Sequence, residues 1–205
     1  MVEYILLKKI VTYRGVFNMA DRMRLLELCL RECAATFGWN LSGNYLSCNK
    51  GYLSFLLFPT LSDKSIEYTL SYRYSSFDRV YHAVTMANIY PGYTIIESYQ
   101  PVEAWSLMGV STAMRSLTSK ADRFAQGLSD RIINVDDNIN FLNYLQKRDI
   151  NEGLRPRSIS MEIVLTYLLT GDNENAIAAA EAAIRSGDTA NGVYQSMIDY
   201  ARRLL

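Results

Sequence analysis

His82 is the one histidine in this 205-residue chain, so any chemistry that uses an imidazole depends on it. A histidine acts as a general base when a nucleophilic hydroxyl or thiol lies within hydrogen-bond reach and a third group orients the ring. His82 lies within 78–86 among apolar neighbours, and the sequence has no GxSxG elbow. We therefore interpret His82 as a structural or surface residue, with a hydrolase or transferase as the remaining alternative.

The cysteines and glycines give no pattern for a metal or a nucleotide cofactor. Cys29, Cys33 and Cys48 have no CxxC spacing, and further metal ligands do not stand beside them. A free cysteine behaves as a small apolar residue, so we expect reduced, buried thiols, which are typical of the cytoplasm. The eleven glycines are dispersed, without a GxGxxG or GxxxxGKS/T loop. The sequence predicts no metal and no cofactor.

Asp136 and Asp137 are the largest acidic cluster that we find in the sequence. Adjacent carboxylates fit a general acid-base pair or half of a magnesium site. At the start of a predicted helix they fit a second role better, because carboxylates there cap free backbone N–H groups and complement the helix dipole. We assign them no catalytic role and retain them as candidate partner-binding residues.

Fifteen tyrosines and two tryptophans are a high aromatic content for a neutral protein. Tyrosine buries its ring while it offers a hydroxyl group, and it is common at protein interfaces. Tyr68, Tyr72 and Tyr74 lie on one face of a predicted strand, so we name them as candidate partner-binding residues. The alternative is that they pack the sheet against the helix predicted at 18–37.

Composition narrows the possible partners and the location. The chain is 49% hydrophobic, with 21 basic and 21 acidic residues and a formal net charge of zero. A balanced charge provides no field that would attract nucleic acid or an anionic membrane surface. Apolar runs such as 55–58 are far shorter than the about 20 residues needed to cross a bilayer, and the first residues do not match an export signal. We expect a cytoplasmic protein.

The first half of the chain has the pattern of a helix followed by a sheet. Apolar spacing predicts a helix at 18–37, which Asn18 would cap. Strict alternation predicts a half-buried strand at 66–75, paired with an interior strand at 52–58. Shorter or weaker patterns follow the same rules and predict strands at 4–13, 45–48 and 93–99, and a helix at 78–86.

After Pro101 the sequence is predicted to be helical to its end. A continuous apolar seam runs from Leu107 to Leu128 and fits either a helical dimer or packing within one domain. A break at 127–134 precedes a helix containing Leu142, and residues 149–158 read as a polar connection. We predict an α+β protein in which an N-terminal helix packs on an antiparallel sheet in domain 1–100, followed by a helical subdomain, 101–205.

Residues 161–184 read as two short helices closed by a Gly-Asp turn. This hairpin resembles a tetratricopeptide repeat, and the resemblance covers about 30 residues. The matching positions are Ile163, Tyr167, Gly171, Ala176, Ala180 and Ala183. Small alanines on the second helix allow the first helix to approach closely. The match departs at Val164, and no proline closes the unit after Ser186. The resemblance implies a scaffold for protein contacts, here as part of a compact helical subdomain.

The first half carries a fainter resemblance to a known family, which lies in the order of its segments. A leading helix is followed by the Phe-Gly-Trp segment 37–39, the Gly-Asn-Tyr segment 43–45, an apolar strand and a tyrosine-rich strand. This order is similar to small bacterial domains, some of which are immunity proteins. Such proteins block a toxin by surface complementarity. We therefore predict a non-enzymatic protein-binding protein, in its narrower form an immunity protein that blocks a bacterial toxin domain. The alternative is a peptide-binding scaffold or adaptor that uses the C-terminal helices.

Overall fold

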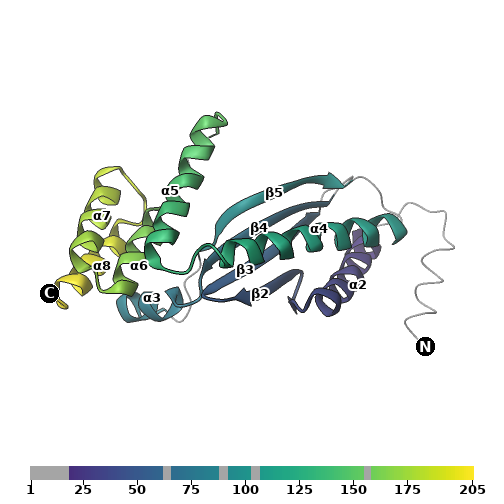
Figure 1. Cartoon of the computed structure of the whole chain (residues 1–205), viewed down its shortest axis with the longest axis horizontal. Coiled ribbons are helices and arrows are strands. Elements are labelled where there is room, and N and C mark those ends of the chain that lie inside the picture. The colour runs from purple at the N-terminus through teal and green to yellow at the C-terminus, as the bar shows by residue number, and fades with distance from the viewer. Residues whose placement is uncertain (1–18, 62–65, 88–91, 103–106, 155–157) are drawn as a thin grey trace. The chain divides into compact units, whose positions relative to one another are not determined.

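The computed structural model describes residues 19–61, 66–87, 92–102, 107–154 and 158–205 and has the predicted α+β fold (Figure 1). The strand predicted at 4–13 and the Asn18 cap lie outside the described residues. Five strands form one antiparallel sheet and lie in the order in which they occur along the chain. They are β1 (Asn40–Ser42), β2 (Tyr45–Lys50), β3 (Leu53–Leu61), β4 (Ile66–Tyr74) and β5 (Thr94–Val102).

The shortest strand was not predicted from the sequence. Strand β1 pairs with β2 through Asn40 and Ser47, Leu41 and Leu46, and Ser42 and Tyr45. The turn between them contains Gly43, whose φ of +60° is a left-handed conformation that glycine adopts without steric cost. A three-residue strand is too short to show an alternating pattern, which is why only its turn was visible in the sequence.

Strand β4 confirms the predicted alternation. Its inward-facing side chains are all buried, namely Ile66, Tyr68, Leu70, Tyr72 and Tyr74. Between them, Glu67 is exposed and Thr69 and Arg73 are half-buried. Ser71 departs from the pattern because it is buried as well. The tyrosine-rich face of this strand therefore belongs to the core.

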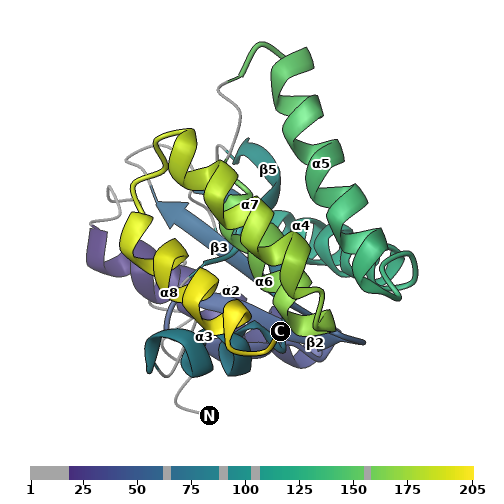
Figure 2. The same ribbon diagram turned by 90° about the vertical axis from the view of Figure 1, so that its left-hand side faces the viewer.

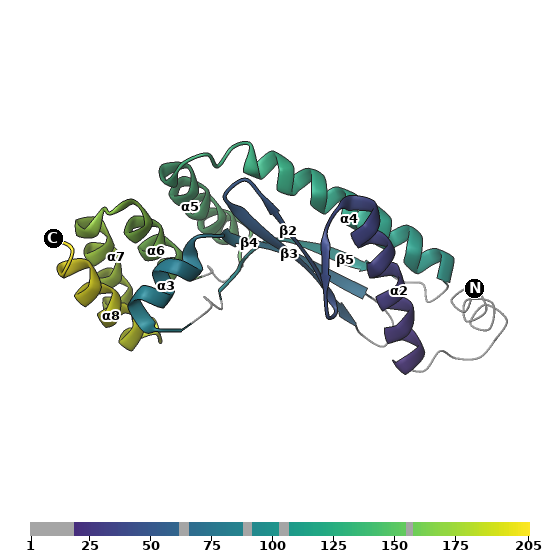
Figure 3. The same cartoon turned by 90° about the horizontal axis from the view of Figure 1, so that it is seen from below.

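The two helices that pack with the first part of the sheet are α2 (Met19–Phe37) and α4 (Leu107–Ser129) (Figures 1 and 3). The apolar face of α2 buries Leu25, Leu26, Cys29, Leu30 and Cys33, whereas Met23 is 42% exposed. Most of the predicted seam of α4 from Val110 to Leu128 is buried, but Phe124 within it is only half-buried. Trp39 follows α2 and donates its indole N–H to Asp122 of α4 at 2.9 Å.

Helix α5 (Val135–Asn151) begins where the sequence predicted but ends later. The prediction that residues 149–158 are a polar connection was wrong at its start, because the helix continues through Asn151. Asp149 is buried on the inner face of the helix, so it belongs to the packed element. The chain leaves the helix at Gly153, whose φ is +70°.

The remaining helices form a packed group that contains the predicted hairpin. They are α3 (Phe77–Thr85), α6 (Ser160–Thr170), α7 (Asn173–Arg185) and α8 (Asn191–Arg202). Helix α7 packs against both α6 and α8, and α3 packs against α6 and α8 (Figure 2). Gly171 ends α6 with a φ of +73°, and Ala176, Ala180 and Ala183 are buried on α7. These small side chains permit close helix contact, as the pattern predicted.

The chain divides into two compact units that interleave along the sequence. The first comprises Met1–Cys48, Phe55–Ser71 and Glu97–Ala125, and the second comprises Asn49–Ser54, Tyr72–Ile96 and Gln126–Leu205. This grouping follows contacts in space, whereas the sequence predicted domains at 1–100 and 101–205. That division of the sequence stays a prediction. Across the described helices, none has the length and apolar character that a membrane crossing requires.

Candidate protein-binding surfaces

The three tyrosines named from the sequence have packing roles. Tyr68 is 1% exposed, and its hydroxyl contacts the sulfur of Met114 within the first unit. In the second unit, Tyr72 and Tyr74 are 2% and 6% exposed. The packing alternative expected all three to pack against the helix at 18–37, but Tyr72 contacts Asn138 and Phe141 of α5, and Tyr74 bonds to the carbonyl of Asn134 at the start of α5. A role for these tyrosines in binding a partner stays a prediction.

Asp137 occupies a capping box at the start of α5. Its carboxylate accepts hydrogen bonds from the backbone N–H groups of Asn134 at 3.3 Å and Ile133 at 3.2 Å. In return, the side chain of Asn134 accepts from the N–H of Asp137 at 2.9 Å. This confirms the predicted capping role of Asp137. Asp136 is exposed in the same first turn, so of the two carboxylates it is the one that solvent reaches fully.

A chain of buried hydrogen bonds fixes α5 in the second unit. Tyr72 donates its hydroxyl to Oδ1 of Asn138 at 2.9 Å, and Nδ2 of Asn138 donates to Oγ1 of Thr166 at 3.0 Å. Thr166 in turn donates to the backbone carbonyl of Glu162 at 2.5 Å. Because Asn138 is 1% exposed, both of its bonds are shielded from water. Strand β4, α5 and α6 are thereby joined through one amide.

The start of α3 is held to β4 by an ion pair. Arg73 donates to both carboxylate oxygens of Asp78 at 2.8 Å, and its guanidinium lies 4.6 Å from the centre of the Tyr93 ring. The Arg73 side chain is 10% exposed and that of Asp78 is 33% exposed. A bidentate pair of this kind combines geometric specificity with charge-assisted bonds. It orders the strand end beside α5.

One flank of α5 carries aromatic side chains from the core to the surface. Tyr72 meets Phe141 edge-on, with ring centres 5.5 Å apart and planes at 68°. Phe141 stacks on Tyr144, with centres 6.2 Å apart and planes at 23°. Tyr144 is 57% exposed. An exposed aromatic ring is thus connected by ring contacts to a fully buried one.

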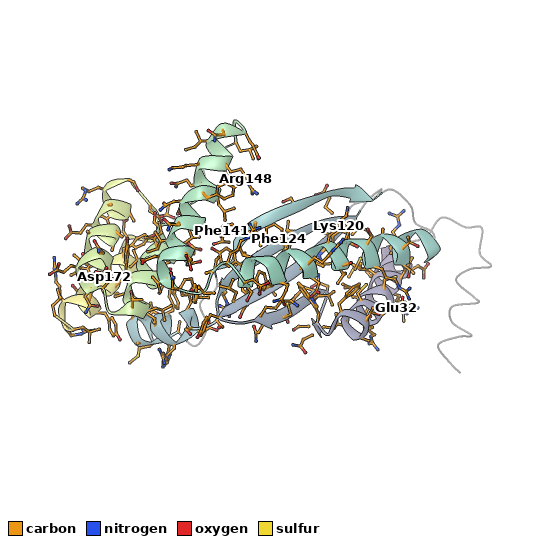
Figure 4. The ribbon with its side chains drawn as sticks, in the orientation of Figure 1. Glu32, Lys120, Phe124, Phe141, Arg148 and Asp172 are labelled. Atoms are coloured by element: carbon orange, nitrogen blue, oxygen red, sulfur yellow. The ribbon has the colours of Figure 1, made fainter. Side chains whose placement is uncertain are left out.

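The same flank continues to Arg148, one and two turns along the helix from Tyr144 and Phe141. Arg148 donates Nη2 to the backbone carbonyl of Ile96 at 3.0 Å, so it ties α5 to β5 (Figure 4). Among the described strands, β5 stands at one end of the order, and its Ile95 is 49% exposed. We call Phe141, Tyr144 and Arg148 the α5 aromatic surface.

Helices α7 and α8 form a second feature, a hollow at the molecular surface. It is lined by apolar and charged side chains, namely Glu181, Ile184, Arg185, Gln195, Ile198 and Arg202. We call these six residues the α7–α8 hollow. Ile198 is 3% exposed and Ile184 is half-buried, whereas the arginine side chains are largely exposed. The hollow therefore has an apolar floor and a charged rim.

The groups first considered for chemistry are an exposed imidazole and buried thiols. His82 is exposed, and its Nδ1 lies 3.2 Å from the carbonyl of Ala87. Burial raises the pKa of the Cys29 thiol to about 12, with Cys33 and Glu32 adding to the effect. A nucleophilic cysteine needs the opposite shift. Within the described part of the chain, no group of three or more metal-ligating side chains is placed to hold a metal ion.

The α5 aromatic surface was not predicted from the sequence. The apolar pattern used for α5 was Ile139, Leu142 and Leu145, of which the two leucines are buried. Phe141, Tyr144 and Arg148 follow a parallel i, i+3, i+7 pattern, which would have indicated a second flank. Two aromatics and an arginine at that spacing are the residue types enriched at protein interfaces.

Comparison of the chain with protein-family models, with curated protein sequences and with solved structures finds no match.

Proposed function

We propose that this chain is a non-enzymatic protein-binding protein and that the α5 aromatic surface is the centre of its binding face. The observation that carries the proposal is Tyr144, which is 57% exposed yet stacked on Phe141. Phe141 is itself packed against the buried Tyr72. An exposed ring that is already ordered loses little conformational entropy when a partner covers it.

The neighbouring strand edge adds a second source of binding energy. Strand β5 has β4 as its neighbour and is the last strand of the order among the residues that the structure describes. An edge strand presents backbone N–H and C=O groups with which an extended segment of a partner can pair. Ile95, 49% exposed on this strand, would add apolar contact area. A partner that covers Tyr144 and reaches β5 would use both features.

The burial of the cysteine thiols supports a non-enzymatic role. The thiols of Cys29 and Cys33 both have a pKa raised by burial, so they stay protonated near neutral pH. Protonated buried thiols are poor nucleophiles. Free, buried cysteines also fit the cytoplasmic location that we propose.

In its narrower form, the proposal is that the chain is an immunity protein that occludes a bacterial toxin domain. The support is the order of elements in the first half, from helix α2 through the turn at Gly43 to the tyrosine-rich strand β4. The formal net charge of zero argues for a binding face based on shape and aromatic contacts rather than on an acidic mimic of a nucleic acid.

The test is neutralisation of the toxin candidate encoded beside this gene, with the purified chain added at stoichiometric concentration. We expect loss of toxin activity with the wild type and a weakened complex with Tyr144→Ala, because truncation of an interface aromatic typically costs about 2 kcal/mol or more. Isothermal titration calorimetry with the inactive toxin candidate gives the dissociation constants of both.

Tyr52→Ala is the matched control, because Tyr52 is a surface tyrosine of similar exposure at 62%. We expect it to bind like the wild type. Toxin activity that persists at stoichiometric wild-type protein would refute the immunity form. Equal binding by Tyr144→Ala, Tyr52→Ala and the wild type would refute the α5 aromatic surface as the binding centre.

A second candidate function is a peptide-binding scaffold that uses the C-terminal helices. The observation in its favour is the α7–α8 hollow, which combines the buried Ile198 with the charged side chains of Glu181 and Arg202. Surface hollows with an apolar floor and a few polar groups are the usual form of a small binding site. Retained peptide binding by Tyr144→Ala would separate this function from binding by the α5 aromatic surface.

A further inference from the structure

We propose that the α7–α8 hollow binds a short acidic peptide segment, with an aliphatic side chain on its floor and a carboxylate at its rim. This inference rests on the second candidate function and names the ligand class. The hollow lies between two packed helices, α7 and α8, and both supply charged side chains to it. Because its floor is apolar and its rim is charged, a ligand that fits it carries both an apolar side chain and a charged group.

The rim has an excess of positive charge. Glu181 lies between two arginines, with 3.6 Å from Oε2 to Nη1 of Arg185 and 3.6 Å from Oε1 to Nη2 of Arg202. Both distances exceed the length of a charge-assisted hydrogen bond, which is about 2.8 Å. One carboxylate therefore faces two guanidinium groups without forming a short bond to either.

The exposure of these groups makes the ion pairs weak and the arginines available. The side chains of Arg185 and Arg202 are 69% and 58% exposed, and that of Glu181 is 41% exposed. Exposed pairs of this kind contribute little to stability because water screens them. A guanidinium offers five N–H donors in a planar fork that matches a carboxylate. Glu181 keeps its place between the arginines, and an incoming carboxylate can use the guanidinium N–H donors that face away from Glu181.

The floor selects for an apolar neighbour of that carboxylate. Ile184 is half-buried and offers apolar surface to an aliphatic side chain of a ligand, whereas Ile198 is 3% exposed and adds little surface of its own. Gln195 lines the same hollow and donates Nε2 to Asp199 at 3.0 Å, which keeps that amide ordered at the edge. Charge complementarity at the rim and apolar area at the floor together fit a peptide in which leucine adjoins aspartate or glutamate.

The experiment measures fluorescence anisotropy of a labelled peptide, fluorescein-Gly-Ser-Leu-Asp-Glu-Leu-Ser-Gly amide, titrated with the full chain. Two comparison peptides replace Asp-Glu by Asn-Gln, or both leucines by serine. We expect saturable binding of the first peptide and at least about tenfold weaker binding of each comparison peptide, because each lacks one of the two recognised groups.

The test variant is the double substitution Arg185→Gln and Arg202→Gln, which removes the positive rim from exposed positions. We expect it to bind the acidic peptide at least about tenfold more weakly. The matched control is Arg31→Gln with Arg123→Gln, two exposed arginines of the first unit, which we expect to bind within about twofold of the wild type.

Four outcomes would overturn the inference, three of which concern the peptides and variants. They are no binding of the acidic peptide, equal binding of the Asn-Gln peptide, and equal loss in the control and test variants. Competition by short inorganic polyphosphate as strong as that by the unlabelled peptide would also overturn it, because it would show general anion attraction. Tyr144→Ala should leave peptide binding unchanged, so failure of this inference is separable from failure of the α5 aromatic surface.

Discussion

Strand β4 contributes aromatic side chains to two cores of different chemical character. In the first unit, the Tyr68 hydroxyl is surrounded by soft, apolar groups and contacts the Met114 sulfur. In the second unit, the hydroxyls of Tyr72 and Tyr74 are bonded to Oδ1 of Asn138 and to the carbonyl of Asn134, each at 2.9 Å. The same residue type on the same strand thus serves apolar packing in one unit and hydrogen bonding in the other.

Burial is the main cause of a raised pKa for the hydroxyl in both cores, and the groups that add to this effect differ. Burial raises the pKa of Tyr68, with the thiols of Cys29 and Cys33 adding to the effect. Burial raises the pKa of Tyr74 to about 12, and there the carboxylate of Asp137 adds to it. An apolar core tolerates small shifts of its helices, whereas directed hydrogen bonds fix them. We infer that hydrogen bonds set the position of α5, on which the proposed binding face depends.

Asn138→Ala is the substitution for which we expect the largest change in the free energy of unfolding. The change leaves the Tyr72 hydroxyl and the Thr166 hydroxyl without their shared partner and removes buried volume. We expect a loss of about 2–4 kcal/mol in the free energy of unfolding, measured by urea denaturation. Asn140→Ala, at an exposed site on the same helix, is the control and should cost less than about 0.5 kcal/mol. Similar losses in both variants would contradict the role of the hydrogen-bond chain.

Removal of single hydroxyls compares the two cores directly. Tyr72→Phe leaves Asn138 with a buried acceptor that has lost its donor, so we expect a loss of about 1–3 kcal/mol in unfolding free energy. Tyr68→Phe removes only a contact with a thioether, which is a weak acceptor, and should cost less than about 1 kcal/mol. Urea denaturation of the two variants under identical conditions gives the difference. A greater loss for Tyr68→Phe would reverse our reading of the two cores.

Most of the fold could be predicted from the sequence because its periodicities are long and regular. The alternation in β4 and the seams of α2 and α4 each extend over several turns or residue pairs, so single exceptions do not hide them. The end of α5 was missed because Asp149 is charged yet buried, and a local pattern treats such a residue as polar surface. The strand predicted at 45–48 lies within β2, and the strand predicted at 52–58 begins within one residue of β3 but ends three residues early, because β3 continues through Pro59 to Leu61.

The candidate surfaces were less predictable for a physical reason. The sequence indicates which residues are apolar, but exposure depends on which helix covers which face. Tyr68 and Tyr144 have the same chemistry, yet one is 1% exposed and the other is 57% exposed. The α7–α8 hollow needs side chains from two helices, Glu181 from one and Arg202 from the other, and their separation is set by tertiary packing. Neither feature follows from local spacing alone.

The start of α5 offers a smaller perturbation of the second unit. Asp137→Ala removes the carboxylate that accepts from Ile133 and Asn134, so we expect a loss of about 1 kcal/mol in unfolding free energy. Asp136→Ala also removes a negative charge from the first turn but breaks no capping box, and it should cost a few tenths of a kcal/mol. Thermal denaturation followed by circular dichroism measures both. Equal losses would assign the effect to the helix dipole alone.

Asp188 is a second hydrogen-bonded carboxylate of the second unit, and through it the stability of this unit depends on pH. Burial acts to raise the pKa of Asp188, but hydrogen bonds from the N–H of Ala190 and from the hydroxyls of Ser158 and Tyr194 outweigh it and lower the pKa. The three donor–acceptor distances are 3.1, 2.9 and 3.0 Å. These bonds tie α8 to the segment before α6 through one ionised group.

The smallest expected effect is the pH dependence of that group. Because the pKa of Asp188 is lower in the folded state, its contribution to stability is present above its ordinary pKa of 3.8 and is lost as the pH falls through the folded pKa. The difference in unfolding free energy between the wild type and Asp188→Asn should therefore be constant near neutral pH and shrink below about pH 4. Urea denaturation at several pH values measures it, with the exposed Asp130→Asn as control. A difference that grows on acidification would show that the hydrogen bonds favour the protonated carboxyl, and Asp188 would then act through neutral contacts, like the contact of Tyr68 with Met114 in the first unit.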